Sequence, residues 1–232
     1  MVFNQLALLF IHGAGSNPLV WHLQLKRFKE DATAIELPGH PTGSGCTSIE
    51  EYAEAVERQI EENHITKPIP VGHSMGGAIA IELALRKPNL GGLVLVGTGA
   101  RLRVRPDFLS KIRENYAEAC RLIAQWSVST KSDPATIQSI AQEMLKANPE
   151  VAYGDFMACD KFDRMRDVER INCPTLIICG EDDRMTPPKY SQYLHDKIRN
   201  SRLLVIPGAG HSVMLEKHRE FSDVIATFLA SL

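Results

Sequence analysis

The 232-residue sequence lacks several features, and each absence excludes a class of protein. It contains no apolar run of about 18 residues, so no membrane-spanning helix is expected. Lys and Arg number 26 against 28 Asp and Glu, and the formal net charge of −2 excludes the strongly basic surface of a protein that coats nucleic acid. We therefore expect neither a membrane nor a nucleic acid as a partner.

Cysteine is scarce and follows no pattern. The five residues form an odd set without a Cys-x-x-Cys pair, namely Cys46, Cys120, Cys159, Cys173 and Cys179. Scattered cysteines favour free thiols in a reducing compartment, so we expect a cytoplasmic protein. The apolar stretch 6–11 is short, has no basic residue before it and continues into His12. It is typical of a buried strand and not of a signal peptide.

Motifs for nucleotides and metals are also absent. Residues 13–15 (Gly-Ala-Gly) follow an apolar stretch, but Pro18 stands where a dinucleotide-binding fingerprint has its third glycine. The glycines of 97–99 fail the same test, because Leu102 occupies that position. The sequence contains neither a His-Glu-x-x-His zinc motif nor a Gly-x-x-x-x-Gly-Lys-Ser/Thr phosphate loop. We expect no cofactor and no metal.

Short apolar segments alternate with helical patterns along most of the chain. Ser48 and Glu51 form a capping box at the start of one such helix. The alternation predicts an α/β fold with a doubly wound, mostly parallel sheet of about six strands, covered by helices on both faces. The predicted strands are 6–11, 32–37, 68–72, 93–96, 175–179 and 202–206, and the predicted helices between and after them are 17–29, 49–60, 78–86, 186–198 and 221–232.

Residues 99–171 interrupt this alternation. They contain helical patterns over 106–128, 133–148 and 149–162 and little that is typical of a strand. We expect an α/β core formed by 1–98 and 172–232, with 99–171 inserted as a helical cap. Aromatic and apolar residues of the cap exceed what three isolated helices need, so some should face a cavity against the sheet. The expected pocket residues are Trp21, Arg101, Trp126 and Phe156.

Three arginines alternate at the start of the cap: Arg101, Arg103 and Arg105. One interpretation is a clamp for a carboxylate on the substrate. The other is that they are solvated or pair with Asp107 and other acids. We favour the second interpretation, because surface charges usually contribute little.

The strongest functional signal is the segment Gly72-His73-Ser74-Met75-Gly76, which has the form G-x-S-x-G between a predicted strand and a predicted helix. A sharp turn at such a place raises the serine above the sheet and needs small neighbours. Ser74 also stands at a helix N-terminus, which favours negative charge. We expect Ser74 to be a nucleophile. The alternative is a glycine-rich turn with an incidental serine.

A serine nucleophile needs a base, and the base needs a carboxylate. His211 follows the last predicted strand, at the end of the sheet where ligands bind, whereas the other histidines are expected in loops or at the surface. Three adjacent acids follow the strand before it. Asp183 is favoured by its position in the loop, and Asp182 is the alternative. An oxyanion would accept hydrogen bonds from the N–H groups of Met75 and Ala14.

These segments together resemble the α/β-hydrolase fold superfamily, and within it the small cap-bearing carboxylesterases and enol-lactonases. The resemblance implies Ser74 as nucleophile, His211 as base and Asp183 as acid. It also implies Ala14 and Met75 as oxyanion donors and 99–171 as the cap. The segments that carry it are 12–15, 36–40, 72–77, 180–187 and 208–211, with Trp21 beyond the first.

Two departures from the family pattern stand out. Glu36 and Pro41 replace the outer residues of the usual Asp-Leu-Pro-Gly-His-Gly segment, a loop that is structural in most members. The family usually begins with two further strands, and because only five residues precede Leu6 we expect them to be missing here. Their loss leaves 32–37 as the edge of the sheet, and an exposed edge strand is a pairing hazard or an interface. We expect the N-terminus or a second copy to cover it, so that the protein is a monomer or a homodimer.

The resulting functional expectation is a serine hydrolase that cleaves a small carboxylic ester, thioester or lactone through an acyl-enzyme, with a small-molecule acyl substrate as its partner. One alternative is hydrolysis or elimination at a C–C bond by the same triad, because one fold supports several chemistries. A third hypothesis is a ligand receptor built on a hydrolase fold. The presence of every triad residue argues against a receptor.

Overall fold

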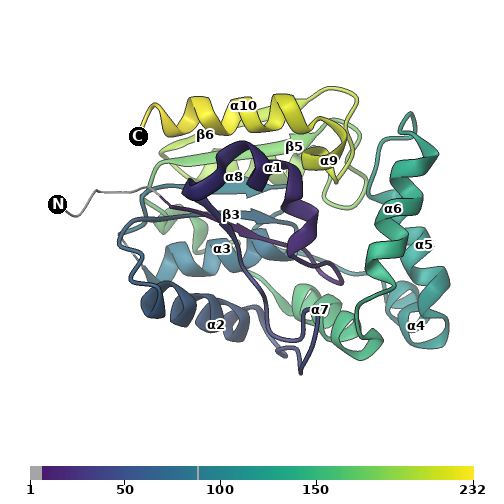
Figure 1. Ribbon diagram of the computed structural model, residues 1–232. Helices are drawn as coiled ribbons and strands as arrows, with labels where there is room; N and C mark the ends of the chain where they lie inside the picture. Colours follow the sequence, from purple (N-terminus) through teal and green to yellow (C-terminus); the bar gives the residue numbers. More distant parts are fainter. Residues whose placement is uncertain (1–6, 88) are drawn as a thin grey trace.

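The computed structural model describes residues 7–87 and 89–232. Its strands form one sheet in the order β2-β1-β3-β4-β5-β6, and every pairing is parallel (Figure 1). This confirms the predicted α/β class and the parallel sheet of about six strands. The strands are β1 (Ala7–Ile11), β2 (Ala32–Ala34), β3 (Pro68–His73), β4 (Leu93–Val96), β5 (Thr175–Gly180) and β6 (Ser201–Ile206).

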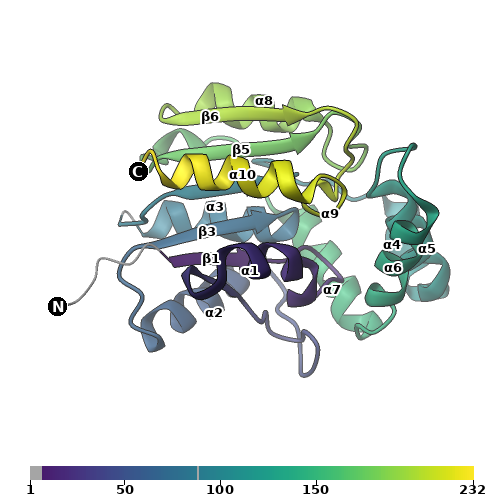
Figure 2. The same ribbon diagram turned by 45° about the horizontal axis from the view of Figure 1, so that its top comes forward.

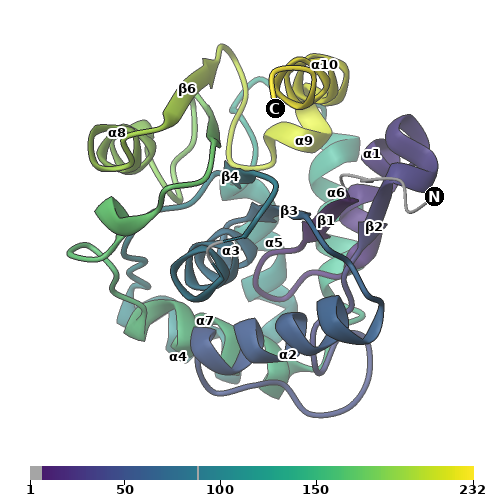
Figure 3. The ribbon, with the colours of Figure 1, turned by 90° about the vertical axis from the view of Figure 1, so that its left-hand side faces the viewer.

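Helices cover both faces of the sheet (Figure 3). Helices α1 (His22–Phe28) and α10 (His218–Leu229) lie on one face, and α2 (Ile49–Glu62), α3 (Met75–Arg86) and α8 (Pro188–Lys197) lie on the other. Successive residues of a strand point to opposite faces, so Leu8 and Phe10 of β1 enter one core while Leu9 and Ile11 enter the other. The remaining short elements are η1 (Pro18–Trp21), η2 (Lys29–Asp31), η3 (Val168–Arg170) and α9 (Val213–Glu216).

The connection between β4 and β5 is helical, and we call its helices α4–α7 the helical insertion. It consists of α4 (Pro106–Glu114), α5 (Tyr116–Trp126), α6 (Pro134–Met144) and α7 (Pro149–Lys161). Figures 1 and 2 show α4, α5 and α6 beyond the ends toward which the strands point. The insertion has a core of its own, which includes Phe108, Ile112, Cys120, Ile123, Met144 and Phe156. The carboxyl ends of the strands therefore face helices.

Several element boundaries differ from the sequence prediction for local reasons. The predicted helix 106–128 is broken at Asn115, whose φ of −152° is not helical. The Asn115 side chain instead accepts a hydrogen bond from the N–H of Glu118 and caps α5. The capping box is half formed, since Ser48 Oγ accepts the N–H of Glu51 at 3.2 Å while the Glu51 carboxylate accepts the N–H of Thr47.

Strand β2 is at one edge of the sheet, as predicted, but it ends at Ala34 instead of residue 37. A three-residue edge strand offers few free backbone groups, which limits pairing with another chain. The residues before 7, which were expected to cover this edge, lie outside the described residues, as does the first residue of the predicted strand 6–11. Pairing with a second copy stays a prediction. In 7–87 and 89–232, no helix has the length and apolar character needed to cross a membrane.

Candidate active site

Ser74 occupies a strained turn between β3 and α3. Its φ and ψ are 55° and −115°, a left-handed conformation that is rare for a residue with a side chain. The turn is held by a hydrogen bond from the Ser74 N–H to the Val96 carbonyl at 3.0 Å. A Cβ at Gly72 would overlap the Gly76 carbonyl, and a Cβ at Gly76 would overlap the carbonyl of Ile11. The two glycines of the motif are therefore required by backbone packing.

His211 lies in the loop between β6 and α9, beside Asp183 from the loop after β5. Its Nδ1 is 2.9 Å from Asp183 Oδ2, and both side chains are buried. Because the carboxylate accepts hydrogen bonds, the proton of a neutral imidazole belongs on Nδ1 and the lone pair on Nε2. His211 Nε2 has no hydrogen-bond partner within the described part of the chain. This nitrogen is therefore free to accept a proton.

The carboxylate of Asp183 is fixed on both oxygens. Oδ1 accepts the N–H groups of Met185 and Thr186, both at 2.9 Å, and Oδ2 accepts the Thr186 hydroxyl at 2.9 Å. Burial raises the pKa of Asp183, but the charge of His211 and the hydrogen bonds outweigh burial and hold this pKa below its usual value. Asp182 accepts the Ser129 hydroxyl at 2.5 Å instead. Of the two acids considered, Asp183 is the one that meets His211.

Two more histidines hold the loops around the site. His73 donates from Nε2 to the His211 carbonyl at 3.1 Å, and burial together with His211 lowers the pKa of His73 to about 3. His12 lies with Nδ1 3.0 Å from the Gly13 carbonyl, and burial together with the neighbouring His40 lowers the pKa of His12 to about 4. Neutral imidazoles at these places act as hydrogen-bond donors, which matches the loop-holding role expected of them.

Ser74 and His211 open onto one cavity of about 330 Å³ between the sheet and the helical insertion. Ala14 lines its base, and neither the Ala14 nor the Met75 N–H donates a hydrogen bond to another residue of 7–87 or 89–232. Glu143 is its one lining carboxylate among the described residues, and no described Lys or Arg lines it. The apolar wall is formed by Leu19, Val20, Ile123, Ile140, Met144, Phe156, Met185, Met214 and Leu215.

Only one of the four residues expected in the pocket lines the cavity. Phe156 lines the cavity, but Trp21, Arg101 and Trp126 do not. Trp21 is fully buried beneath the site, because η1 turns its ring into the core between Phe10 and Phe221, with ring centroids 4.9 and 6.2 Å away. Trp126 packs on Phe108 inside the insertion. Sequence reasoning missed Ile140 and Met214, which have no local signal because the insertion and the short α9 bring them to the cavity.

The three arginines that precede α4 do not line the cavity at Ser74. Arg101 lines a separate hollow with Met165 and Tyr190, and its Nη1 is 3.7 Å from an Asp163 oxygen. Arg105 pairs with Asp107 at 2.7 Å, and Arg103 donates to the Asp160 carbonyl at 2.8 Å. This arrangement matches the interpretation in which they pair with neighbouring groups, and it contradicts a clamp at the cavity. No cluster of His, Cys, Asp or Glu suited to a metal occurs in the described residues.

Comparison with known proteins identifies the class. The model of the Alpha/beta hydrolase family matches residues 8–224, so the chain belongs to this family. This confirms the resemblance that the motifs indicated.

Individual relatives are named as ester-cleaving enzymes. The pimeloyl-[acyl-carrier protein] methyl ester esterase of Neisseria meningitidis serogroup A is 27% identical over 238 residues, covering 94% of this chain and 75% of the relative. A solved structure described as a thermophilic esterase is 37% identical with a TM-score of 0.86, covering 97% and 89% of the two chains. The enol-lactonase from Burkholderia xenovorans LB400 shares the fold, with a TM-score of 0.89 at 20% identity, and the match covers 97% and 92%.

Proposed function

We propose that this protein is a serine hydrolase that cleaves small carboxylic esters, thioesters or lactones through an acyl-enzyme on Ser74. Its family and its esterase relatives make it a hydrolase of the ester type. One observation carries the finer proposal. The Asp183–His211 pair leaves Nε2 of the imidazole without a partner among the described residues, at the cavity that Ser74 also lines.

The mechanism follows from these groups. Ser74 Oγ attacks the acyl carbonyl while His211 Nε2 takes its proton, and Asp183 stabilises the imidazolium that results. The carbonyl oxygen becomes an oxyanion and accepts hydrogen bonds from the N–H groups of Ala14 and Met75, each worth about 3 kcal/mol. His211 then protonates the leaving alcohol or thiol. A water molecule repeats the sequence and releases the acid, which returns the serine to its starting state.

The walls of the cavity favour a small, uncharged acyl group. A volume of about 330 Å³ lies at the lower end of the 300–1,000 Å³ typical of small-molecule sites. The wall is largely apolar. Its one carboxylate among the described residues, Glu143, pairs through Oε1 with Lys146 at 2.6 Å, and Lys146 does not line the cavity. A substrate carboxylate inside this cavity would therefore have no lining Lys or Arg as its partner. Since no arginine of residues 7–87 and 89–232 lines the cavity, ester cleavage is favoured over chemistry on an anionic C–C substrate.

The test is hydrolysis of p-nitrophenyl esters of graded acyl length by the wild-type protein, Ser74→Ala and Ser222→Ala. Ser222 is a buried serine of α10 outside the cavity, so S222A is the matched control. We expect S74A to lose a factor of about 10⁴–10⁶ in kcat and to lose labelling by a fluorophosphonate, with S222A close to wild type. Activity in S74A above a tenth of wild type contradicts the proposal, and a wild-type protein that resists labelling favours a receptor.

A further inference from the structure

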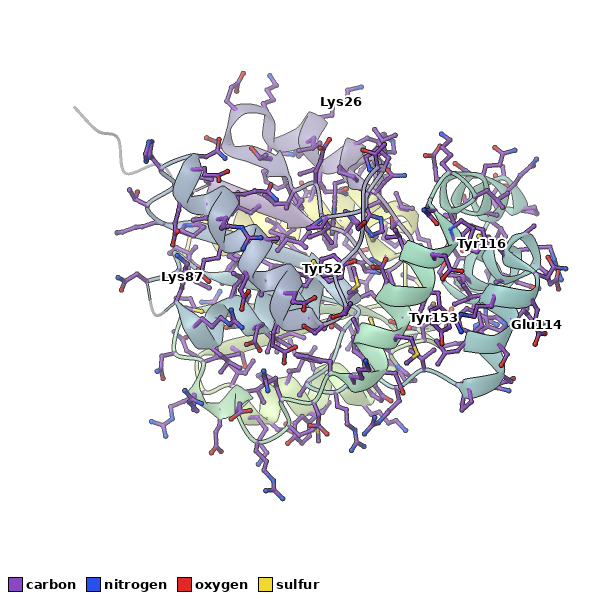
Figure 4. The ribbon with its side chains drawn as sticks, turned by 90° about the horizontal axis from the view of Figure 1, so that it is seen from below. Lys26, Tyr52, Lys87, Glu114, Tyr116 and Tyr153 are labelled. Carbon is purple, nitrogen blue, oxygen red and sulfur yellow. The ribbon has the colours of Figure 1, made fainter. Side chains whose placement is uncertain are left out.

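Asp155 is a buried carboxylate of the helical insertion that the proposed mechanism does not use. It lies on α7 with no exposed surface. Its Oδ2 accepts the N–H of Gly15 at 2.9 Å, and its Oδ1 accepts the Tyr52 hydroxyl at 2.5 Å. Figure 4 shows Tyr52 on α2, at the place where this helix lies beside α7. The carboxylate thus joins the insertion to two separate segments of the core.

A histidine lies beside this carboxylate. His40 Nε2 lies 3.1 Å from Asp155 Oδ2, and His40 Nδ1 lies 2.9 Å from the Ser16 carbonyl oxygen. Nδ1 donates to this carbonyl, whereas Nε2 faces Asp155 without a hydrogen bond in the described part of the chain. The Asp155 carboxylate accepts its hydrogen bonds from Gly15 and Tyr52. Removing Asp155 would leave the N–H of Gly15 without its acceptor.

These contacts converge on the loop after β1, residues 13–16, which we call the oxyanion loop. Gly15 has a φ of 62°, and its N–H is fixed by Asp155. The Ser16 carbonyl faces His40, and the Ser16 N–H closes a turn to the Gly13 carbonyl at 3.2 Å. Ala14 lies between these fixed points and lines the cavity. The orientation of its peptide groups therefore depends on Asp155.

We propose that Asp155 is a positioning residue for the oxyanion loop: it fixes the Ala14–Gly15 peptide through the Gly15 N–H, and this orients the adjoining Gly13–Ala14 peptide, whose N–H, that of Ala14, faces the oxyanion formed on Ser74. This inference rests on the proposed function. The oxyanion exists only in the transition state and in tetrahedral intermediates, so a displaced donor lowers kcat and leaves KM nearly unchanged. The helical insertion then has a second role besides forming the pocket wall, because it completes the catalytic geometry.

The variant Asp155→Ala tests the proposal, because alanine leaves no acceptor for the N–H of Gly15, and Asp160→Ala is its matched control. Asp160 lies on the same helix and also accepts a backbone N–H, that of Val104 at 3.0 Å, but outside the cavity. We expect D155A to lower kcat by a factor of about 10²–10³, the effect of losing one oxyanion donor, with KM changed less than threefold. D160A is expected to keep kcat within about twofold of wild type.

Two further measurements separate positioning from stability. Binding of a boronic acid, whose tetrahedral serine adduct mimics the oxyanion, should weaken at least thirtyfold in D155A, while binding of the carboxylic acid product stays unchanged. Tyr52→Phe removes one hydrogen bond from the same carboxylate but leaves its contact with Gly15. Y52F should therefore lower the melting temperature and keep kcat within threefold of wild type.

The outcomes are distinct. A folded D155A with kcat within threefold of wild type overturns the proposal, as does a kcat loss in Y52F equal to that in D155A. If D155A does not fold, His40→Ala tests the other fixed point of the same loop, the hydrogen bond to the Ser16 carbonyl. H40A should lower kcat at least tenfold at unchanged KM, and an unchanged kcat overturns the inference. Full activity in S74A refutes the proposed function itself, whereas an inactive S74A with a fully active D155A refutes only the role of Asp155.

Discussion

The variant Asp183→Asn changes the chemistry of a single buried oxygen. Asparagine has the shape of aspartate, and its oxygen is expected at the Oδ1 place, where the N–H groups of Met185 and Thr186 both need an acceptor. In the reversed orientation, the NH₂ group of the amide would face those two N–H donors and leave both without an acceptor. The NH₂ group therefore takes the place of Oδ2 and faces Nδ1 of His211, which is 2.9 Å away. The imidazole must then carry its proton on Nε2.

The expected magnitude follows from this tautomer. With the proton on Nε2, His211 has no lone pair directed at the cavity and cannot accept the proton of Ser74. The corresponding change in a serine protease triad lowers kcat about 10⁴-fold, which is about 5 kcal/mol of transition-state stabilisation. Stability should fall by much less, about 1–3 kcal/mol, since the hydrogen bonds at Oδ1 are retained.

The assay is steady-state hydrolysis of a short p-nitrophenyl ester, together with urea unfolding, on D183N and its neighbour variant Asp182→Asn. Asp182 has a hydrogen bond to Ser129 and none to His211, so D182N should keep kcat within a few-fold. If D182N loses more activity than D183N, or if D183N keeps more than 1% of wild-type kcat, the assignment of Asp183 is wrong. The unfolding data show whether either loss reflects a damaged fold.

Three further outcomes are expected. Glu143→Gln removes the one carboxylate that lines the cavity in the described residues, so kcat/KM for an ester with a carboxylate on its acyl chain should rise severalfold while that for a neutral ester stays constant. Burial lowers the pKa values of His12 and His73 from 6.5 to about 4 and about 3, so the unfolded chain binds more protons. Their contribution to stability is present above pH 6.5 and is lost as the pH falls toward 4. The urea unfolding midpoint should therefore fall over this pH range, and it should fall less in the variant His73→Gln. Gly76→Ala should prevent soluble folding or lower the melting temperature strongly, because its Cβ overlaps a β1 carbonyl. Gly154 lies inside α7, and a Cβ there would have its nearest non-local atom 3.6 Å away. Gly154→Ala should therefore stabilise the protein by about 0.5–1 kcal/mol. Calorimetry would measure the opposite effects of the two glycine substitutions.

The parts of the site that sequence reasoning located are those with local geometry. The turn at Ser74 needs small residues two positions before and after it, so its requirement is visible within five residues. Asp183 and His211 each follow a strand of a parallel sheet, and the carboxyl ends of such strands all lie at the same end of the sheet. The order of strands and helices therefore placed both groups at the same end of the molecule as Ser74.

The parts that were missed depend on contacts between distant segments. Asp155 and Tyr52 lie 103 positions apart, and an aspartate on a helix carries no sign that it is buried against a loop near the N-terminus. Trp21 was expected in the pocket but is buried in the core. The direction of its ring depends on the single turn of η1, which spacing does not reveal. The break at Asn115 was hidden because helical periodicity continues on both sides of a capping residue.

The position of the helical insertion has a consequence for how such proteins diversify. Strands β4 and β5 are neighbours in the sheet, and their register is maintained by hydrogen bonds between them, whatever segment connects them. Helices α4–α6 can therefore be exchanged between relatives without altering the sheet, and each exchange brings a new pocket wall. Helix α7 is different, because its carboxylate binds Gly15. Chimeras are thus expected to keep their turnover when the junction lies before α7, and to lose it when a foreign α7 lacks that acid.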